Sequence, residues 1–442
     1  MPTKLLAATL VLFAAVAAQA VDDKPAQSAN DPQLAGQINR LVSQLNDDRA
    51  SERDAAEKKL SQLAGTTTAQ VDHFLSTLPK ETDEMPVAVR ERLARIRKRV
   101  EERAAMAATA ATTVTLDAQQ MSFASVIAAI EKQTGNKFVD NREQQGGQSG
   151  NIHITMNVKH ERFWPVVDQI LDQAKLGIYS YGGKDVLSIV PRDPADRPRV
   201  GRAEYIGPFR LEITDVQAER SLRQRGQSSL KLQLEVAWEP RLRPIAITQP
   251  AADLKAATDS ASQLEIAQPE ASLDVEVPNG TQAAEITLPF KLPARTVKRI
   301  TVLHGKLHVL VPGRQVKFRF DDLTHAAGKS QRQGGVQVTV DDVRKNNAVW
   351  EVHMRLTLDE PNGALQSHRA WVFQNLSYMV GKDGKKIENA GLETTRQTKN
   401  EVGNAYMFDL PNGIDGLTWV YETPAAIVDL PVDYEIKNID LP

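Results

Sequence analysis

Two acidic pairs are the side chains of this chain that could hold a metal ion. Asp321-Asp322 and Asp341-Asp342 follow equivalent strand-like segments in two similar blocks of sequence. Ca²⁺ prefers carboxylate oxygens, and loops at the junction of two β domains could bring both pairs together. Aspartate also ends strands through local hydrogen bonds in turns, and neither pair has the ligand spacing of a calcium-binding loop. The turn interpretation is therefore preferred, and the four aspartates are only weak calcium candidates.

No other group of residues predicts a reaction or a cofactor. The sequence has no G-x-S-x-G, H-E-x-x-H or Walker A motif. The glycine-rich residues 146–151 lack the Lys-Ser/Thr and the helix of a phosphate-binding loop, so they predict a plain loop. His304 and His308 would lie about 13 Å apart along a strand, at about 3.3 Å per residue, which is too far to share a metal ion directly. We therefore expect no catalytic residue, no cofactor and no enzymatic activity.

A basic run near residue 95 does not predict a nucleic-acid site. Its positive charges alternate with Glu91, Glu101 and Glu102, which is typical of a solvated helix face. The formal net charge of the chain is -2, which gives no reason to expect nucleic acid as a partner. The basic residues are Arg90, Arg92, Arg95, Arg97, Lys98, Arg99 and Arg103.

The first residues predict export. Lys4 precedes an apolar run that ends near Ala18, and Ala18-Gln19-Ala20 is a small-x-small cleavage site before Val21. The run is shorter than the roughly 20 apolar residues that span a bilayer, and no second run of that length follows. We therefore expect a signal peptide, residues 1–20, that is cleaved after Ala20. The mature chain should be periplasmic or secreted and have no membrane span.

The length and composition predict several globular domains. The chain has 442 residues, of which 41% are hydrophobic and 25% charged, and it has no cysteine for disulfides or a thiolate zinc site. Residues 21–33 are polar and predict a flexible lead-in. Residues 34–110 carry short helical stripes in pairs that are similar to a HEAT-like repeat. Two pairs are fewer than the ~3 repeats of a solenoid, so we predict a helical cap or spacer.

Residues 113–192 contain one pattern of apolar positions twice. Each copy predicts an amphipathic helix after a strand, with Ser122 as a possible N-cap and Gly135 as a stop for the first helix. The stripes are Phe123, Val126, Ile127 and Ile130, and then, forty positions later, Phe163, Val166, Val167 and Ile170. Strand-like runs between and after the helices give the order β-α-β-β-α-β-β. We expect Trp164 to be buried beside Phe163, and Ser188 to lie on an edge strand of one small sheet.

Three segments of this region carry a family resemblance. "VTLDAQQMSFASVIAAIEKQTGNKFV", "IHITMNVKHERFWPVVDQIL" and "LGIYSYGGKDVLSIV" resemble the secretin and TonB short N-terminal (STN) domain. In secretins and TonB-dependent receptors this domain makes protein-protein contacts in the periplasm, between an outer-membrane machine and inner-membrane or signalling partners. The resemblance implies an adapter module here, with envelope proteins as partners, and it implies no catalytic residue.

The second half of the chain predicts β structure. "FRLEITDVQ" and "LKLQLEVAWEP" resemble the later "GVQVTVDDVRK" and "VWEVHMRLTLDEP", and "LHVLVPGRQVKFRFDDL" resembles "AAIVDLPVDYEIKNIDL". We therefore predict two tandem immunoglobulin-like β-sandwiches, residues 205–325 and 326–442. A proline- and arginine-rich linker, residues 193–204, should precede them and be cut first by proteases. Candidate core residues of the sandwiches are Trp238, Trp350, Trp371 and Trp419.

Together these patterns predict a multi-domain α+β protein that is exported and acts as a non-enzymatic interaction adapter in the cell envelope. Two alternatives stay open. The first is a carbohydrate- or cell-surface-binding protein, which an exposed row of Trp371, Tyr378 and Tyr421 would favour. The second is a hydrolase whose site has no recognised motif.

Overall fold

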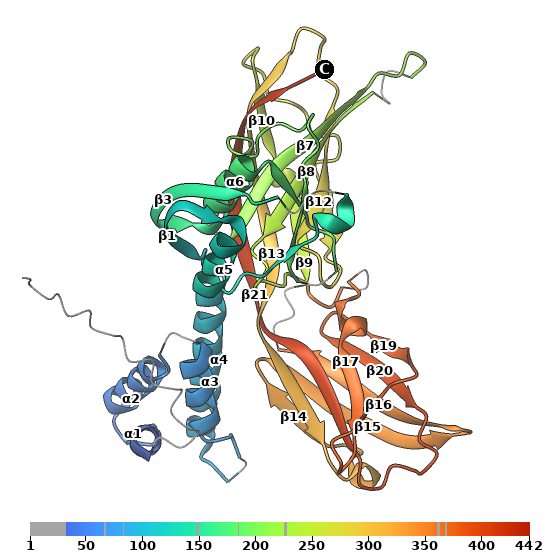
Figure 1. The fold of residues 1–442 in the computed structure, drawn as a ribbon. Coiled ribbons are helices and arrows are strands. Elements are labelled where there is room, and N and C mark those ends of the chain that lie inside the picture. The colour runs from blue at the N-terminus through green and yellow to red at the C-terminus, as the bar shows by residue number, and fades with distance from the viewer. Residues whose placement is uncertain are drawn as a thin grey trace, which may run out of the picture.

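The computed structural model describes residues 32–442 except 66–67, 83, 147–149, 184, 225–227, 360–362 and 367–368. The predicted signal peptide, most of the lead-in and half of the glycine-rich segment 146–151 therefore lie outside the described residues. The described part combines α-helices with mostly antiparallel β-sheets, which confirms the coarse α+β class (Figure 1).

Four helices form the helical segment at the N-terminal side. They are α1 (Pro32–Gln44), α2 (Ala50–Leu63), α3 (Thr68–Thr77) and α4 (Val87–Ala108). Their apolar sides share a core around Ile38, Leu60 and Leu93. None of the described helices is both long enough and apolar enough to cross a membrane.

The basic residues of α4 do not form the fully solvated face that the sequence predicts. Arg92, Arg95 and Arg99 all reach the carboxylate of Glu57 on α2, with the shortest N···O distance, 2.8 Å, at Arg92. Glu57 is itself buried. Much of this positive charge therefore holds α4 against α2.

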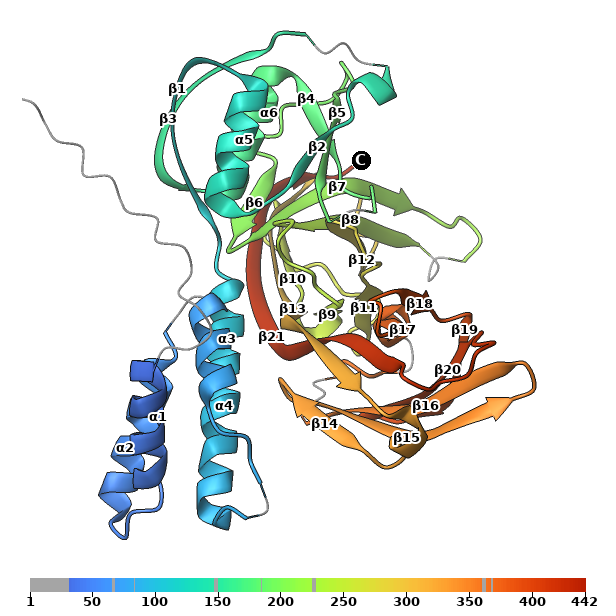
Figure 2. The same ribbon diagram turned by 60° about the horizontal axis from the view of Figure 1, so that its bottom comes forward.

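The α/β module, residues 113–192, has two sheets and not one. In chain order its elements are β1 (Thr113–Ser122), α5 (Phe123–Thr134), β2 (Phe138–Asp140), the 3₁₀ turn η1 (Glu143–Gln145), β3 (His153–Arg162), α6 (Phe163–Ala174), β4 (Leu176–Tyr179) and β5 (Leu187–Pro191). β1 pairs with β3, and β2, β5 and β4 form a separate sheet in that order. The two helices lie between the two sheets (Figure 2). Each helix is therefore covered by strands on two sides.

The predicted signals at the two ends of α5 act as expected, whereas the prediction that Ser188 lies on an edge strand is wrong. The Ser122 hydroxyl accepts a hydrogen bond from the Ser125 N–H at 3.2 Å, and Gly135 ends α5 with a φ of 73°. Ser188 lies on β5, the central strand of its sheet, and is 2% exposed. The outer strands of that sheet are β2 and β4, because β5 pairs on both sides.

The second half of the chain builds two cores between three sheets. The first outer sheet contains β6 (Ala203–Ile206), β7 (Phe209–Glu219), β8 (Ser229–Trp238) and β12 (Ala283–Lys291). The second outer sheet contains β14 (Ser330–Gln333), β15 (Val336–Asn346), β16 (Val349–Leu358), β19 (Gly391–Gln397) and β20 (Glu401–Phe408). One long sheet faces both outer sheets, so it closes a first and a second sandwich.

The long sheet has seven strands and is continuous through both sandwiches. It contains β9 (Ala246–Pro250), β10 (Lys255–Thr258), β11 (Ser272–Glu276), β13 (Arg299–Phe320), β17 (Leu376–Val380), β18 (Lys386–Glu388) and β21 (Thr418–Asp440). Short 3₁₀ turns, η3 (Ala251–Asp253), η4 (Leu323–His325) and η5 (Trp371–Gln374), connect its strands and loops.

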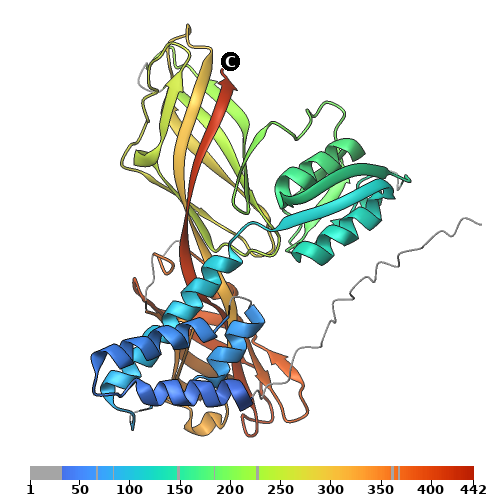
Figure 3. The same cartoon turned by 90° about the vertical axis from the view of Figure 1, so that its left-hand side faces the viewer.

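β13 and β21 pair along their whole length, from Arg299 with Asp440 to Phe320 with Trp419. The first half of β13 and the second half of β21 belong to the first core, which includes Tyr434 and Ile436. The other halves belong to the second core. The second sandwich is therefore inserted into the first, as the yellow and red strands in Figure 3 show. The predicted division at residues 325 and 326 does not describe this arrangement, because residues 428–440 return to the first sandwich.

Helix α4 braces the point where the paired strands pass from one sandwich to the other. Arg314 of β13 bonds Glu101 of α4 at 2.5 Å and Asp72 of α3 at 3.3 Å. Gly313 lies so close to α4 that a Cβ added there would be 2.4 Å from the Cβ of Ala105. The helical segment thus contacts the ribbon at its crossing point.

The predicted linker, residues 193–204, is held against the α/β module. Arg199 donates from Nε to Asp168 of α6 at 2.7 Å, and its main-chain N–H donates to Asp172 at 2.8 Å. Arg192 also bonds Asp172, at 2.5 Å. Trp164 is buried as predicted, but its Nε1 donates to the carbonyl of Pro208, so it packs against the first sandwich. The linker prediction overlooked these ion pairs.

Candidate interaction surfaces

The acidic pairs do not converge on a metal site. Asp321 accepts a hydrogen bond from Thr418, Asp322 accepts from Thr324 at 2.7 Å, and Asp341 pairs with Arg355 at 2.7 Å. Hydrogen bonds from Thr324 and then His325 lower the pKa of Asp322. Within the described ranges, no group of three or more His, Cys, Asp or Glu residues could hold a metal ion.

Asp321 and Asp322 also lie away from the domain junction, near which the two acidic pairs could have converged. The strands cross between the sandwiches at Gly313, and β13 then continues to Phe320. Asp321 is therefore about 26 Å beyond the junction at about 3.3 Å per residue. The turn interpretation fits the hydrogen bonds that Asp321 and Asp322 accept.

The histidine pair and the aromatic row have structural partners. His304 contacts Glu435 at 3.4 Å and His308 contacts Asp429 at 3.0 Å, both across the β13–β21 pairing. The aromatic residues that would favour a carbohydrate surface are buried: Trp371 is 5% exposed, Tyr378 3% and Tyr421 0%. That row therefore offers no surface to a sugar.

The β1–β3 ribbon is an open backbone element of the α/β module. Each strand has ten residues, and in the described part of the chain each pairs only with the other. One face carries Leu116, Ile154 and other apolar side chains into the core, and the residues between them are exposed. Both strands therefore keep an outer edge that no strand covers.

The ribbon has an approximate twofold symmetry that follows the forty-residue repeat. The N–H of Gln120 donates to the Thr155 hydroxyl at 3.3 Å, and the N–H of His160 donates to the Thr115 hydroxyl at 3.0 Å. Gln120 and His160 both have a φ of 53°, at matching irregularities of the two strands. The forty-residue repeat thus predicts that Thr115 and Thr155 are equivalent positions. It does not predict that each hydroxyl accepts a hydrogen bond from the opposite strand.

Glutamine side chains cover the outer edges of this ribbon. Gln133 of α5 donates from Nε2 to the carbonyl of Thr115 at 3.0 Å and accepts the Thr115 N–H at 2.9 Å. On the other strand, Gln173 of α6 accepts the Thr155 N–H at 3.3 Å. A side-chain amide of this kind occupies the position of a neighbouring strand's peptide group. No sequence motif marked these two glutamines.

A second exposed feature lies where the α/β module meets the first outer sheet. The rings of Tyr179 and Tyr181 contact edge-to-face with centroids 5.9 Å apart, and they are 50% and 39% exposed. Burial, and then the nearby Glu235 and Glu285, raise the pKa of Tyr181. Burial also raises the pKa of Glu235, which faces Glu285 across β8 and β12. No sequence pattern predicts this corner, because Glu235 and Glu285 are far from the two tyrosines in the chain.

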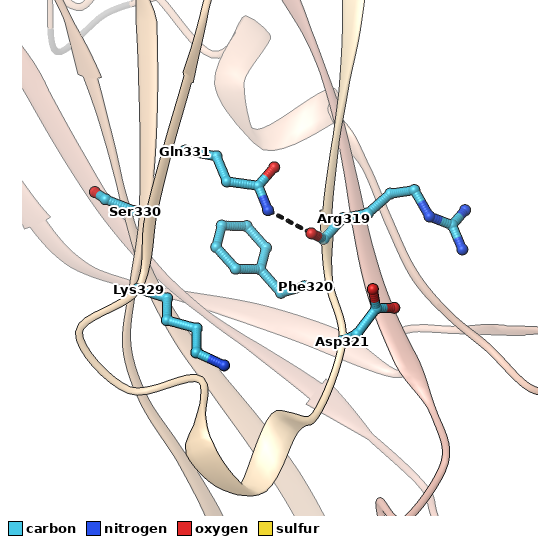
Figure 4. A pocket seen from close by; sticks show the side chains of 6 residues that line it. All are labelled: Arg319, Phe320, Asp321, Lys329, Ser330 and Gln331. Carbon is cyan, nitrogen blue, oxygen red and sulfur yellow. Dashed lines mark hydrogen bonds between the residues drawn. The ribbon is translucent and has the colours of Figure 1, made fainter. Parts of the chain in front are cut away.

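A hollow of about 340 Å³ opens in the second sandwich between the end of β13 and the start of β14 (Figure 4). Its lining comes from Arg319, Phe320 and Asp321 on one side and from Lys329, Ser330 and Gln331 on the other. The amide of Gln331 donates across it to the carbonyl of Arg319.

The chain was also compared with known proteins. No family model, no curated protein and no solved structure matches it.

Proposed function

We propose that this chain is an exported, non-enzymatic envelope protein that acts as a protein-protein adapter through its α/β module. The observation that carries the proposal is the β1–β3 ribbon with two outer strand edges that only side-chain amides cover. The resemblance of residues 113–192 to the STN domain supports the same role. In this proposal the signal peptide ends at Ala20, the protein acts in the periplasm or outside the cell, and its partners are envelope proteins.

A partner would bind by adding a strand to the ribbon. Free strand edges pair readily with an extended segment of another chain, because their N–H and C=O groups need partners. Gln133 makes only two hydrogen bonds to Thr115, and each contributes about 0.5–1.5 kcal/mol net. A partner strand that bonds several residues of β1 can therefore displace this side chain at low cost.

The other parts would position this ribbon. The buried ion pairs from Asp168 fix the α/β module on the first sandwich, and α4 fixes the crossing point of the two sandwiches. In this proposal the two immunoglobulin-like sandwiches and the HEAT-like helical segment act as a rigid spacer.

One observation favours the carbohydrate- or surface-binding alternative. Tyr179 and Tyr181 form an exposed aromatic pair near Glu235 and Glu285, and aromatic rings beside carboxylates suit a polar ligand with an apolar face. The alternative would thus use this corner and not the buried Trp371, Tyr378 and Tyr421.

The test compares Thr115→Pro with Thr115→Ala in the full mature chain. Both variants remove the hydroxyl, but only proline removes the edge N–H that a partner strand needs. A photo-crosslinking residue at the exposed Asp117 of β1 should capture an envelope partner in the alanine variant and in the parent, and lose it in the proline variant. Thermal unfolding checks that both variants fold.

The full chain is needed because residues 110–192 alone would expose Trp164 and Asp168, which are buried against the first sandwich. Equal capture by the proline and alanine variants would defeat the edge mechanism. Capture only from a crosslinker placed at Glu285 would instead support the surface-binding alternative.

A further inference from the structure

β13 and β14 run side by side in the second sandwich without joining into one sheet. β14 pairs with β15, and residues 314–320 of β13 pair with β21. In the described chain no backbone pairing connects these residues of β13 to β14. We call the space between residues 314–320 and residues 330–333 the seam.

Two glutamine side chains bridge the seam. Gln331 donates from Nε2 to the carbonyl of Arg319, and Gln333 donates from Nε2 to the carbonyl of Lys317 at 3.2 Å. The two donating glutamines are two residues apart, and so are the two accepting carbonyls. Along a strand, the backbone groups of every second residue face the same side. A glutamine side chain carries the same amide as a peptide bond. The bridges therefore stand where the N–H groups of a neighbouring strand would donate.

The hollow at the loop end of the seam provides space and charge. The ring of Phe320 lies between the two strands and is 2% exposed, so it forms a packed aromatic floor (Figure 4). Among the charged lining residues, Lys329 extends its side chain into the hollow, whereas the side chains of Arg319 and Asp321 point away from it (Figure 4). Asp321 also accepts a hydrogen bond from Thr418. The charge that faces the hollow is therefore the Lys329 ammonium group, which favours an acidic segment.

We propose that the seam binds an extended, acidic peptide segment of a partner protein, whose backbone N–H groups replace the glutamine amides at the carbonyls of Lys317 and Arg319. The segment adds a strand beside β13, with a side chain on Phe320 and an acidic side chain near Lys329. One amide replaces another, so the number of hydrogen bonds is conserved. This site is separate from the α/β module and stands whether or not the adapter function holds.

The probe is the peptide acetyl-Thr-Val-Glu-Val-Thr-amide, added to the full mature chain. Hydrogen exchange followed by mass spectrometry should show slower exchange in residues 314–320 when the probe is present. A probe with N-methylated valines lacks both donors and should bind at least about tenfold more weakly, since each of the two unmade hydrogen bonds is worth up to about that factor. A probe with lysine in place of glutamate should also bind more weakly, because of the positive lining.

Two kinds of protein variant should change the affinity for the probe in opposite directions. Gln331→Ala combined with Gln333→Ala should bind the probe more tightly, because no side chain then has to be displaced. Lys317→Pro should bind it about tenfold more weakly than Lys317→Ala, because proline lacks the edge N–H. Thr115→Pro should leave probe binding unchanged, which separates this site from the ribbon of the α/β module.

Three results would overturn the proposal. They are unchanged exchange of residues 314–320 at millimolar probe, equal binding of the N-methylated probe, and weaker binding to the double alanine variant. The exchange measurement uses the parent protein and does not depend on whether a variant folds.

Discussion

Asp168 is a buried carboxylate whose ion-pair partners lie outside its own helix. It accepts from Arg199 at 2.7 Å, from Arg210 at 2.8 Å and from the Tyr205 hydroxyl at 2.7 Å. Burial by itself would raise the pKa of Asp168, but the guanidinium groups of Arg199 and Arg210 outweigh it and lower that pKa. The residue thus joins the α/β module, the linker and the first sandwich.

We predict that Asp168→Asn lowers the free energy of unfolding by about 3 kcal/mol at pH 7, because Arg210 stays buried after losing one of its charge partners. The folded-state pKa of Asp168 is below its usual value, so its contribution is present above about pH 4 and is lost as the pH falls through the lower, folded-state value. The difference between parent and variant should shrink accordingly in urea unfolding at decreasing pH.

Asp440→Asn is the matched control, because this carboxylate pairs with Arg299 but is 73% exposed. Its effect should stay within about 0.5 kcal/mol, as for other surface pairs. If Asp168→Asn proves no more destabilising than this control, the buried pairs do not hold the domains together.

At the scale of elements, the contact of α4 with the β13–β21 ribbon depends on a glycine. A Cβ on Gly313 would be 2.4 Å from the Ala105 Cβ and 3.1 Å from the Ala426 carbonyl. Neither atom is the end of a flexible side chain, so the elements must move apart. The close approach also lets Arg314 reach Glu101, whose pKa is raised by burial although Arg314 opposes that shift.

We predict that Gly313→Ala destabilises the protein by about 1–3 kcal/mol, the usual cost of overpacking, and speeds hydrogen exchange at the end of α4. Combining it with Ala105→Gly should restore part of the loss, since the two residues share one contact. Gly391→Ala is the control, because a Cβ there meets nothing within 4 Å. Additive effects of Gly313→Ala and Ala105→Gly would rule out the direct clash.

At the scale of the whole molecule, the paired strands tie the two sandwiches into one insertion topology. Tyr434, near the end of β21, is 3% exposed in the first core, and its hydroxyl donates to Gln249 at 2.9 Å. Tyr421, near the start of the same strand, is fully buried in the second core. β21 therefore contributes buried side chains to both cores.

We predict that Tyr434→Ala speeds hydrogen exchange in β8 and β9 of the first sandwich, whereas Tyr421→Ala speeds it in β16 and β20 of the second. Each substitution should cost about 3–5 kcal/mol, as for other buried aromatic residues. Two tandem domains divided at residue 325 would instead show the effect of both substitutions in the second sandwich only.

The sequence alone determined the local structure of the α/β module. A helical period is set by residues three or four positions apart, so the Phe123 and Phe163 stripes predicted α5 and α6. The signals at Ser122 and Gly135 are equally local, and both act at the ends of α5 as predicted. The repeat of forty residues also placed Thr115 and Thr155 at equivalent positions.

Only the tertiary structure decided which strands and side chains meet. The sequence predicts that the two similar segments, now β13 and β21, belong to different sandwiches, but they pair with each other and divide between both cores. Gln133 covers the edge at Thr115, and Glu239 accepts the N–H of Thr112, which is 127 positions earlier in the chain. Such pairings depend on burial and on geometry across distant segments, and periodicity within one segment carries no information about them.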